Sequence, residues 1–465
     1  MSAYIIEGGH PLDGSVRIHG AKNSVLPILA ACLLAPGECV IHNCPELSDV
    51  AASLDILRHL GCRAERQGDA VVVDASAPTG WDVPDALMRE MRSSVIFLGA
   101  ILGRMGRAEL CAPGGCELGP RPIDLHLGAI RGLGGRITED GGGLRAEGAL
   151  RGADLVLSLP SVGATENAML AAVCAAGTTT ITNAAREPEI VDLQGFLRAI
   201  GAKVHGAGSS VITVEGGVPL HGGSYAVMGD RIVAATYLAA AASAGGTVEV
   251  TGVDYRHLST VSAVLREAGC DVQSGAESIR LRRDGPLQGV RPVRTAPYPG
   301  FPTDAQAPLM AALTRGKGCT VFVENIFESR YRHVDELSRM GGGHPGGGPC
   351  GGGVRRAAAP RGPGAGHGSP GRSGAGGGRP GSGGTQRAYR CAPHRPGLPV
   401  PGGRSPPPGR RDPADLRVFL GYVHKSATFL WDTDRNQNRQ ESSWNGGEKE
   451  QTGTAAESGA LQRAL

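Results

Sequence analysis

One pattern recurs about every 70 residues up to Met340, and it constrains the fold more than any other feature. In each copy a helix-like segment ends in an apolar residue and glycine, and a small residue and a short strand follow. These glycines are Gly61, Gly134, Gly201, Gly269 and Gly341. Because glycine readily adopts the left-handed conformation that ends many helices, the pattern predicts alternating helices and strands, and therefore an α/β fold.

The second half of each unit repeats as well. A turn opens an Ala/Leu-rich helix, and glycine and an alternating strand follow it, as in residues 20–41 and 163–181. Further copies begin near Met228 and Pro302, and a weaker one near Met91. Since the first copy lacks its front half, we expect the fold to close by returning the C-terminal part of the chain to the N-terminal part.

The pattern stops after Met340. Between Gly341 and Arg411 the chain has no Asp, Glu, Lys or Ile, and its one aromatic residue is Tyr389. Gly, Pro, Ala and Arg dominate there, as expected of GC-rich DNA translated in the wrong frame. Read one base later, residues 341–350 permit Gly-Ala-Asp-Ile-Arg-Val-Glu-Gly-Arg, which is a strand of the kind that the fifth unit requires.

Two further segments of the tail also permit ordered, protein-like sequences when they are read one base later. In the same shifted frame, residues 367–372 permit Thr-Asp-Leu-Arg-Ala, and residues 392–399 permit His-His-Ile-Asp-Arg-Gly-Tyr. We therefore predict that one extra base just after the Met340 codon has shifted the frame. Residues 341–465 are then an out-of-frame, low-complexity tail, which we expect to be disordered.

Polar residues lie where the predicted helices begin. The plain interpretation of Asn23, Ser93, Thr165 and Thr303 is helix capping. Cations in the same position, at Lys22, Arg92 and Arg231, oppose the helix dipole. They indicate either a bound anion or charges on the solvated surface.

A thiol lies within a loop rich in glycine and proline. Residues 112–122 place six Gly or Pro residues around Cys116, and Arg121 is close enough in sequence to tune the thiol pKa. From the loop alone, a turn with an incidental cysteine is the favoured interpretation. The other cysteines are scattered without the spacing of a zinc site or a disulfide framework, so we expect reduced thiols and no metal.

Composition excludes several classes of protein. The net charge of +3 argues neither for nor against a nucleic-acid partner. No run of about 18 apolar residues is present, so no membrane span is predicted. The first residues lack a basic segment followed by an apolar one, so we expect no secretory signal and a cytoplasmic protein.

Several motifs together resemble those of one family. They are the segments 20–23, 115–116 with 121–126, 161–165, 299–304 and 327–330. On these motifs residues 1–340 resemble the UDP-N-acetylglucosamine 1-carboxyvinyltransferases, an enolpyruvyl transferase family. The resemblance implies transfer of enolpyruvyl from phosphoenolpyruvate to the 3′-hydroxyl of UDP-N-acetylglucosamine, with release of phosphate. It also implies a cytoplasmic role at the start of peptidoglycan synthesis, in cell-wall biogenesis, cell shape and division, without a metal or organic cofactor.

The resemblance also implies the roles of individual residues. Cys116 would be the general acid and Asp304 the base near the attacking hydroxyl, although Asp304 could also be a helix N-cap. Lys22, Arg92 and Arg121 would hold phosphoenolpyruvate. The remaining residues implied for the substrate site are Asn23, Pro122, Ile123, Asp124, Leu125, Ser161, Val162, Ile326 and Arg330.

The implied architecture is a two-domain, inside-out α/β barrel of repeated units. Residues 1–21 and 230–340 would form an incomplete first domain, residues 22–229 a second domain with the Cys116 loop, and residues 341–465 the tail. We expect low activity, because the arginines of the Thr-Asp-Leu-Arg-Ala and Asp-Arg-Gly-Tyr motifs are absent from the translated chain. The oligomeric state is not indicated by the sequence.

Two other functions compete with this one. The related 5-enolpyruvylshikimate-3-phosphate synthases share the implied fold but lack the Gly-Gly-Cys loop. The second competing function is that of a non-enzymatic protein whose Gly/Arg tail binds RNA. That tail lacks interleaved aromatics and regular Arg-Gly-Gly repeats, so we expect no nucleic-acid partner.

Overall fold

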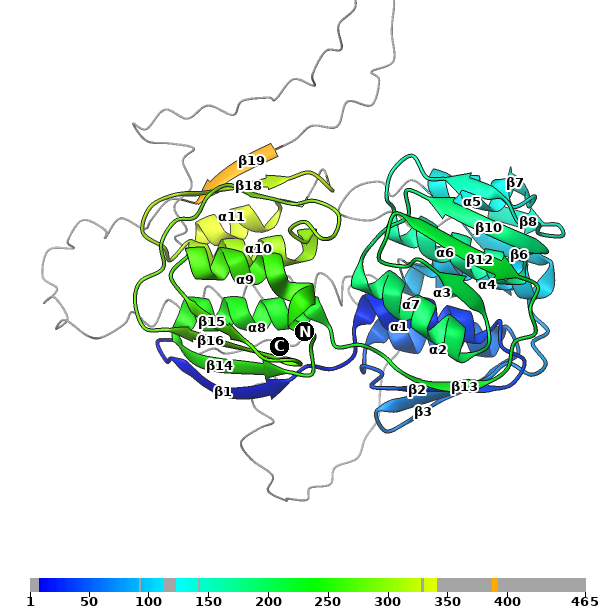
Figure 1. Ribbon diagram of the computed structural model, residues 1–465, viewed down its shortest axis with the longest axis horizontal. Coiled ribbons are helices and arrows are strands. Elements are labelled where there is room, and N and C mark those ends of the chain that lie inside the picture. Colours follow the sequence, from blue (N-terminus) through cyan, green and yellow to red (C-terminus); the bar gives the residue numbers. More distant parts are fainter. Residues whose placement is uncertain are drawn as a thin grey trace, which may run out of the picture.

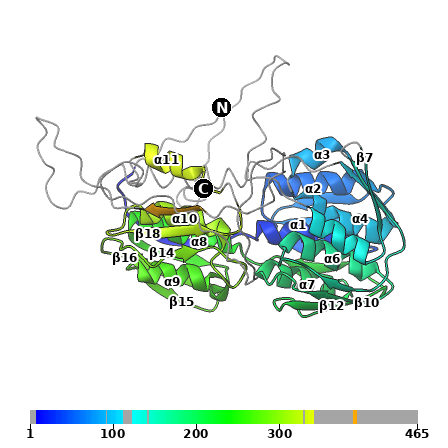
Figure 2. The ribbon, with the colours of Figure 1, turned by 90° about the horizontal axis from the view of Figure 1, so that it is seen from above.

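The computed structural model describes residues 8–91, 93–111, 123–140, 143–327, 330–340 and 387–391. Helices and sheets alternate along the chain, so the predicted α/β class is confirmed. The described part forms two bodies, each with helices inside and sheets outside (Figure 1). Figure 2 shows the same two bodies from above, joined near α1 and α8.

Four of the described sheets repeat one topology. In each, the first two strands are parallel and the next two are antiparallel to their neighbours. Their strands are β1 (Leu12–Arg17), β14 (Gly246–Thr251), β16 (Ser278–Arg283) and β15 (Asp271–Ser274); β13 (Gly223–Ala226), β2 (Glu38–His42), β4 (Ala70–Asp74) and β3 (Arg63–Gln67); β5 (Asp82–Val83), β6 (Arg107–Cys111), β8 (Gly143–Glu147) and β7 (Arg136–Asp140); and β9 (Asp154–Val156), β10 (Gly177–Thr182), β12 (Val211–Gly216) and β11 (Lys203–His205).

The fifth sheet has three strands among the described residues. β17 (Val293–Arg294) is parallel to β18 (Thr320–Glu324), and β19 (Arg387–Cys391) is antiparallel to β18, with Thr320 opposite Cys391. β19 therefore occupies the position that β4, β8, β12 and β16 hold in the other sheets. It comes from the predicted tail, of which all other residues lie outside the described part. An unpaired edge of β18 would leave its N–H and C=O groups without partners, and β19 satisfies them.

The helices fall into two sets. The inner helices are buried along most of their length, and the many alanines of α6, α8 and α10 let these three pack closely. They are α1 (Lys22–Cys32), α4 (Phe97–Met105), α6 (Val162–Cys174), α8 (Arg231–Ala244) and α10 (Thr303–Leu313). The others are α2 (Ser48–His59), α3 (Asp85–Glu90), α5 (Asp124–Gly132), α7 (Pro188–Ala199), α9 (Ser259–Glu267), α11 (His333–Arg339) and the 3₁₀ helices η1 (Ser94–Ile96) and η2 (Tyr255–Leu258). None of the described helices has the length and apolar character needed to cross a bilayer.

Four glycines of the repeat have the predicted conformation, and the fifth, Gly341, lies outside the described residues. Gly61 and Gly134 each have φ of 91°, Gly201 has 98° and Gly269 has 97°. In each case the glycine directly follows the C-cap residue of a helix, at α2, α5, α7 and α9. The left-handed turn then directs the chain into the following strand.

Buried apolar side chains gather in two separate cores. One extends from Val25 to Val227, and the other contains Val16, Ile18 and the residues from Ala234 to Leu337. This division supports the two-domain boundaries expected from the sequence, which remain a proposal. We call residues 22–229 the α1–α7 half, and residues 8–21 and 230–340 the α8–α11 half.

The two halves are joined where the chain crosses between them twice. The Ala21 N–H donates to Met228 O at 2.7 Å, and the Asp230 N–H donates to His19 O at 3.0 Å. Gly20 and Gly229 pair between these bonds. A Cβ on Gly229 would lie 1.9 Å from Gly252 O, so only glycine fits there.

We predict that Gly229→Ala destabilises the chain by about 1–3 kcal/mol, because a methyl group would force the backbone of the crossing apart. Urea unfolding would measure the change. Gly128→Ala is the matched control, since a Cβ on Gly128 in α5 meets no atom of the described residues within 4 Å. That variant should gain roughly 0.5–1 kcal/mol from the better helix propensity, so equal effects of the two substitutions would contradict the prediction.

Candidate active site

The residues assigned from the sequence fall into two groups. Cys116, Arg92, Arg121 and Pro122 lie outside the described residues. The described ones lie at or near the starts of helices, or in the loop after β18. They are Lys22 and Asn23 at α1, Ile123, Asp124 and Leu125 at α5, Ser161 and Val162 at α6, Asp304 at α10, and Ile326 and Arg330 after β18.

Capping was the wrong interpretation for Asn23, Thr165 and Thr303, whereas Ser93 occupies the N-cap position of η1 without a side-chain cap bond. No side-chain cap bond is found at the starts of α1, η1 or α10. Thr165 Oγ1 instead accepts from the Ala185 N–H at 3.0 Å, and Thr303 donates to Glu324 at 2.9 Å. The cap of α6 is Ser161, which accepts from the Ala164 N–H at 3.4 Å.

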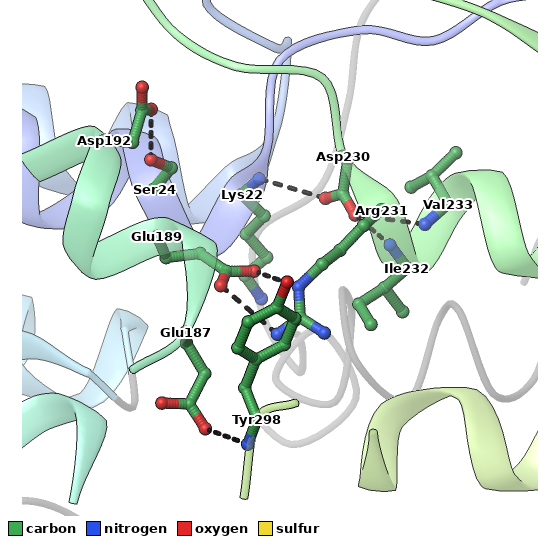
Figure 3. A network of polar contacts seen from close by, with 10 residues as sticks. All are labelled: Lys22, Ser24, Glu187, Glu189, Asp192, Asp230, Arg231, Ile232, Val233 and Tyr298. Atoms are coloured by element: carbon green, nitrogen blue, oxygen red, sulfur yellow. Dashed lines mark hydrogen bonds and ion pairs between the residues drawn. The ribbon is translucent and has the colours of Figure 1, made fainter. Parts of the chain in front are cut away.

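The cations at the starts of α1 and α8 have carboxylate partners. Lys22 Nζ lies 2.6 Å from Asp49 Oδ2, and the Lys22 N–H donates to Asp230 Oδ2 at 3.1 Å. Asp230 also caps α8, since its Oδ1 accepts from the N–H groups of Ile232 at 2.8 Å and Val233 at 3.0 Å. One carboxylate therefore binds the first turns of two helices from opposite halves (Figure 3).

Arg231 is buried, so the interpretation of this residue as a solvated surface charge is wrong. Its Nε donates to Glu189 Oε1 at 2.9 Å and its Nη2 to Glu189 Oε2 at 3.2 Å, with side-chain exposures of 9% and 4%. The guanidinium also lies 5.8 Å from the ring centre of Tyr298, whose N–H donates to Glu187 Oε1 at 3.1 Å. Figure 3 shows these contacts between the two halves.

Glu166 adds a third carboxyl group beside Glu187 and Glu189. It lies in the buried second turn of α6. Burial raises the pKa of Glu166 well above its usual value, and the negative charges of Glu189 and Glu187 raise it further. The carboxyl group is therefore protonated in the folded chain at pH values where a free glutamate is ionised.

Asp304 forms an ion pair with Arg330. Arg330 Nη2 donates to Asp304 Oδ1, with Arg330 buried and Asp304 half-buried. Asp304 is the second residue of α10, and Pro302 occupies the N-cap position, so the N-cap interpretation of Asp304 is wrong. The pairing holds the carboxylate at the start of the helix, where the dipole also favours a negative charge.

Glu324 holds the loop that contains Ile326. Its Oε1 accepts from Thr295 Oγ1 and from the Ile326 N–H, each at 2.9 Å, while its Oε2 accepts from Thr303 Oγ1 at 2.9 Å. The side chain of Ile326 is 40% exposed at the end of this loop. Sequence reasoning missed Glu324, although a charge at the end of the apolar strand Val-Phe-Val-Glu was a usable signal.

His126 supports the start of α5. Its Nδ1 lies 2.8 Å from Asn167 Nδ2, and Asn167 Oδ1 accepts from the Gly99 N–H at 2.7 Å. Burial lowers the pKa of His126 to about 4, so the ring is neutral near pH 7. This contact links α4, α5 and α6, and it fixes the turn that contains Asp124 and Leu125. Within the described residues, no group of three or more His, Cys, Asp or Glu side chains is arranged to hold a metal ion.

Comparison with known proteins gives one consistent family. The family model for EPSP synthase (3-phosphoshikimate 1-carboxyvinyltransferase) matches residues 6–344. UDP-N-acetylglucosamine 1-carboxyvinyltransferase 2 of Caldanaerobacter subterraneus is 46% identical over 342 residues, which are 73% of this chain and 82% of that protein. UDP-N-acetylglucosamine 1-carboxyvinyltransferase 1 of Symbiobacterium thermophilum is 47% identical over 345 residues, covering 73% and 78%.

Solved structures show the same fold. The enolpyruvyl transferase NikO from Streptomyces tendae superposes with a TM-score of 0.67 at 24% identity, covering 84% of this chain and 85% of that one. EPSP synthase from Acinetobacter baumannii gives a TM-score of 0.55 at 21% identity, covering 73% and 80%. At these identities the likeness supports the fold alone.

We predict that Glu166→Gln stabilises the chain near neutral pH. The raised pKa means that the folded state retains a proton which the unfolded state releases, so stability falls as pH rises above the usual glutamate pKa of 4.5. Glutamine carries no ionisable group, so the variant should lose this slope and gain roughly 1–2 kcal/mol at pH 7.5, with little gain near pH 4. Thermal unfolding between pH 4 and 8 measures it. Glu147→Gln, on the exposed side of β8, is the control, and parallel pH profiles for Glu166→Gln and the parent chain would refute the prediction.

Proposed function

The chain belongs to the UDP-N-acetylglucosamine 1-carboxyvinyltransferase family, and we propose that it transfers enolpyruvyl from phosphoenolpyruvate to the 3′-hydroxyl of UDP-N-acetylglucosamine, releasing phosphate. The observation that carries the proposal is the identity of 46% over 82% of a relative with that name. The proposed setting is the cytoplasm, at the first committed step of peptidoglycan synthesis. Cell-wall biogenesis, cell shape and cell division would depend on this step.

The starts of α1, α8 and α10 support a common site. The Lys22 N–H donates to Asp230, which directly precedes Arg231 in the chain, and the Asp304 carboxylate is near enough to help raise the pKa of Arg231, after the larger effect of Glu189. These observations support a shared site at the junction of the two halves for Lys22, which is proposed to bind phosphoenolpyruvate, and Asp304, which is the proposed base. Helix N-termini also favour anions, which fits two substrates that carry phosphate and carboxylate groups.

The proposed reaction is addition followed by elimination. The 3′-hydroxyl adds to C2 of phosphoenolpyruvate, Asp304 accepts the hydroxyl proton, and the Cys116 thiol gives a proton to the methylene carbon. The tetrahedral intermediate then loses a proton from the new methyl group and expels phosphate, which restores the double bond. Lys22, Arg92 and Arg121 would stabilise the charge on phosphate and carboxylate. Arg330 would orient Asp304, since the two are paired in the structure.

The remaining assigned residues would bind the sugar nucleotide. Asn23, Asp124 and Ile326 are exposed, and Ile123, Leu125, Ser161 and Val162 are half-buried, so their side chains are accessible to a ligand. Pro122 belongs to the same segment but lies outside the described residues.

We propose further that residues 341–465 are translated out of frame and that transfer by this chain is slow. The family model ends at residue 344, and the relatives match over 342 to 345 residues. In the shifted frame the tail would supply the Thr-Asp-Leu-Arg-Ala and Asp-Arg-Gly-Tyr motifs, whose arginines the resemblance assigns to phosphoenolpyruvate and the moving loop.

We expect purified chain to release phosphate far more slowly than a version from which one base after the Met340 codon has been removed. Phosphate release with phosphoenolpyruvate and either UDP-N-acetylglucosamine or shikimate 3-phosphate measures both the rate and the acceptor. Sequencing of the gene across this point tests the frame directly. Equal rates for the two versions would refute the frame proposal, and turnover with shikimate 3-phosphate alone would support the synthase instead.

We predict that Asp304→Asn, in the version with the base removed, lowers kcat by about 10²–10⁴-fold, the usual contribution of a positioned general base. Binding of UDP-N-acetylglucosamine, measured by calorimetry, should weaken much less because the amide keeps the shape of the side chain. Asp284→Asn is the control, since Asp284 is exposed and pairs with Arg282 alone among the described residues. An unchanged kcat in Asp304→Asn would exclude Asp304 as the base.

A further inference from the structure

We propose that Arg231 is a positioning residue, which fixes the loop before α10, and with it Asp304, to the opposite half of the molecule. It would act with Glu189, Glu187 and Tyr298, a group that we call the Arg231 latch. The inference rests on the proposed function for the role of Asp304, whereas the mechanical coupling stands on the contacts alone.

The first contact of the latch is the ion pair between α8 and α7. Arg231 is the first residue of α8 and Glu189 the second residue of α7, and the two form two hydrogen bonds of 2.9 and 3.2 Å. A two-point contact fixes both the distance and the angle between the groups, which a single contact does not. Because both side chains are almost fully buried, the pair also resists screening by salt.

The second contact reaches the loop before α10. Glu187, next to the start of α7, accepts the Tyr298 N–H at 3.1 Å, and the Tyr298 ring lies near the guanidinium of Arg231. Glu187 of the α1–α7 half thus holds this loop by its backbone, and Arg231, which is itself bound to Glu189 of that half, contacts its ring. The charge of Arg231 favours the ring face, in the manner of a cation–π contact.

The loop transmits its position to Asp304 because it is short and internally bonded. The Ala296 N–H donates to Phe301 O at 3.1 Å, and the Gly300 N–H donates to Pro297 O at 2.8 Å. The next residues begin α10, where Thr303 is bound to Glu324. A displacement of Tyr298 therefore moves the first turn of α10, and the Asp304 carboxylate is in that turn.

The energetics favour a positioning role over a purely stabilising one. When two charges are buried, the free energy gained from their attraction is about equal to the free energy lost by removing them from water. A hydrophobic pair would therefore stabilise the junction at least as well. A buried bidentate pair instead specifies one arrangement. At this junction that arrangement aligns two halves that share only two chain crossings among the described residues.

Hydrogen exchange on the full-length chain tests the latch without requiring turnover. Arg231→Gln and Glu189→Gln should each raise exchange in residues 296–304 by at least about tenfold, because the loop opens locally once its anchor is lost. The double variant should show no further increase, since both substitutions remove the same contact. The exposed pair of Arg136 and Glu147 provides the matched control, and Arg136→Gln should leave this segment unchanged.

A charge swap separates positioning from general destabilisation. Glu189→Arg combined with Arg231→Glu restores the attraction, so it should return exchange in residues 296–304 toward the parent level. Unchanged exchange in the single variants overturns the proposal. So does a rise spread over the whole chain that the swap fails to reverse.

Binding of UDP-N-acetylglucosamine gives the functional readout. Arg231→Gln should weaken binding by about tenfold, and the swap should recover most of it, because the rim that contains Asp304 is realigned. If the parent chain does not bind the nucleotide sugar, the proposed function fails, and the exchange data still decide whether the latch exists. If binding is equal in the parent and Arg231→Gln while exchange rises, Arg231 is not a positioning residue for the site.

Discussion

The Asp230 carboxylate bears the constraint on which the rest of the structure depends. It receives the first N–H of α1 from one half and two N–H groups of α8 from the other, so one side chain sets the starts of two inner helices. Free N–H groups at a helix start need such a partner, and a carboxylate also matches the helix dipole. Lys22 and Arg231 take their positions from these two helix starts.

Alanine-rich inner helices make this arrangement possible. α8 is buried from Ala234 to Ala244 apart from one residue, and α10 is buried from Ala305 to Leu313. Small side chains allow close approach of helices, so the sheets can cover the outside. The chemistry of the chain is thereby concentrated at the ends of helices rather than on their faces.

Several carboxyl groups then meet near Arg231. Glu187, Glu189, Glu166 and Asp304 all lie within electrostatic reach of one another or of Arg231. Such a cluster would repel itself if every group were ionised. The structure avoids this with one buried cation and one carboxyl group whose pKa is raised by burial.

The sequence by itself determined the α/β class, the repeat and the helix-ending glycines, because these depend on local periodicity and on a conformation that glycine adopts cheaply. It also indicated the family, and Lys22 and Asp304 as candidate site residues, because each of the motifs that contain them is a continuous stretch of sequence. The tertiary structure alone decided that Arg231 is buried against Glu189, that Thr303 bonds Glu324 rather than capping α10, and that β19 completes the edge of β18. These contacts join residues far apart in the chain, and no local pattern encodes which partner a buried charge or an open strand edge will meet.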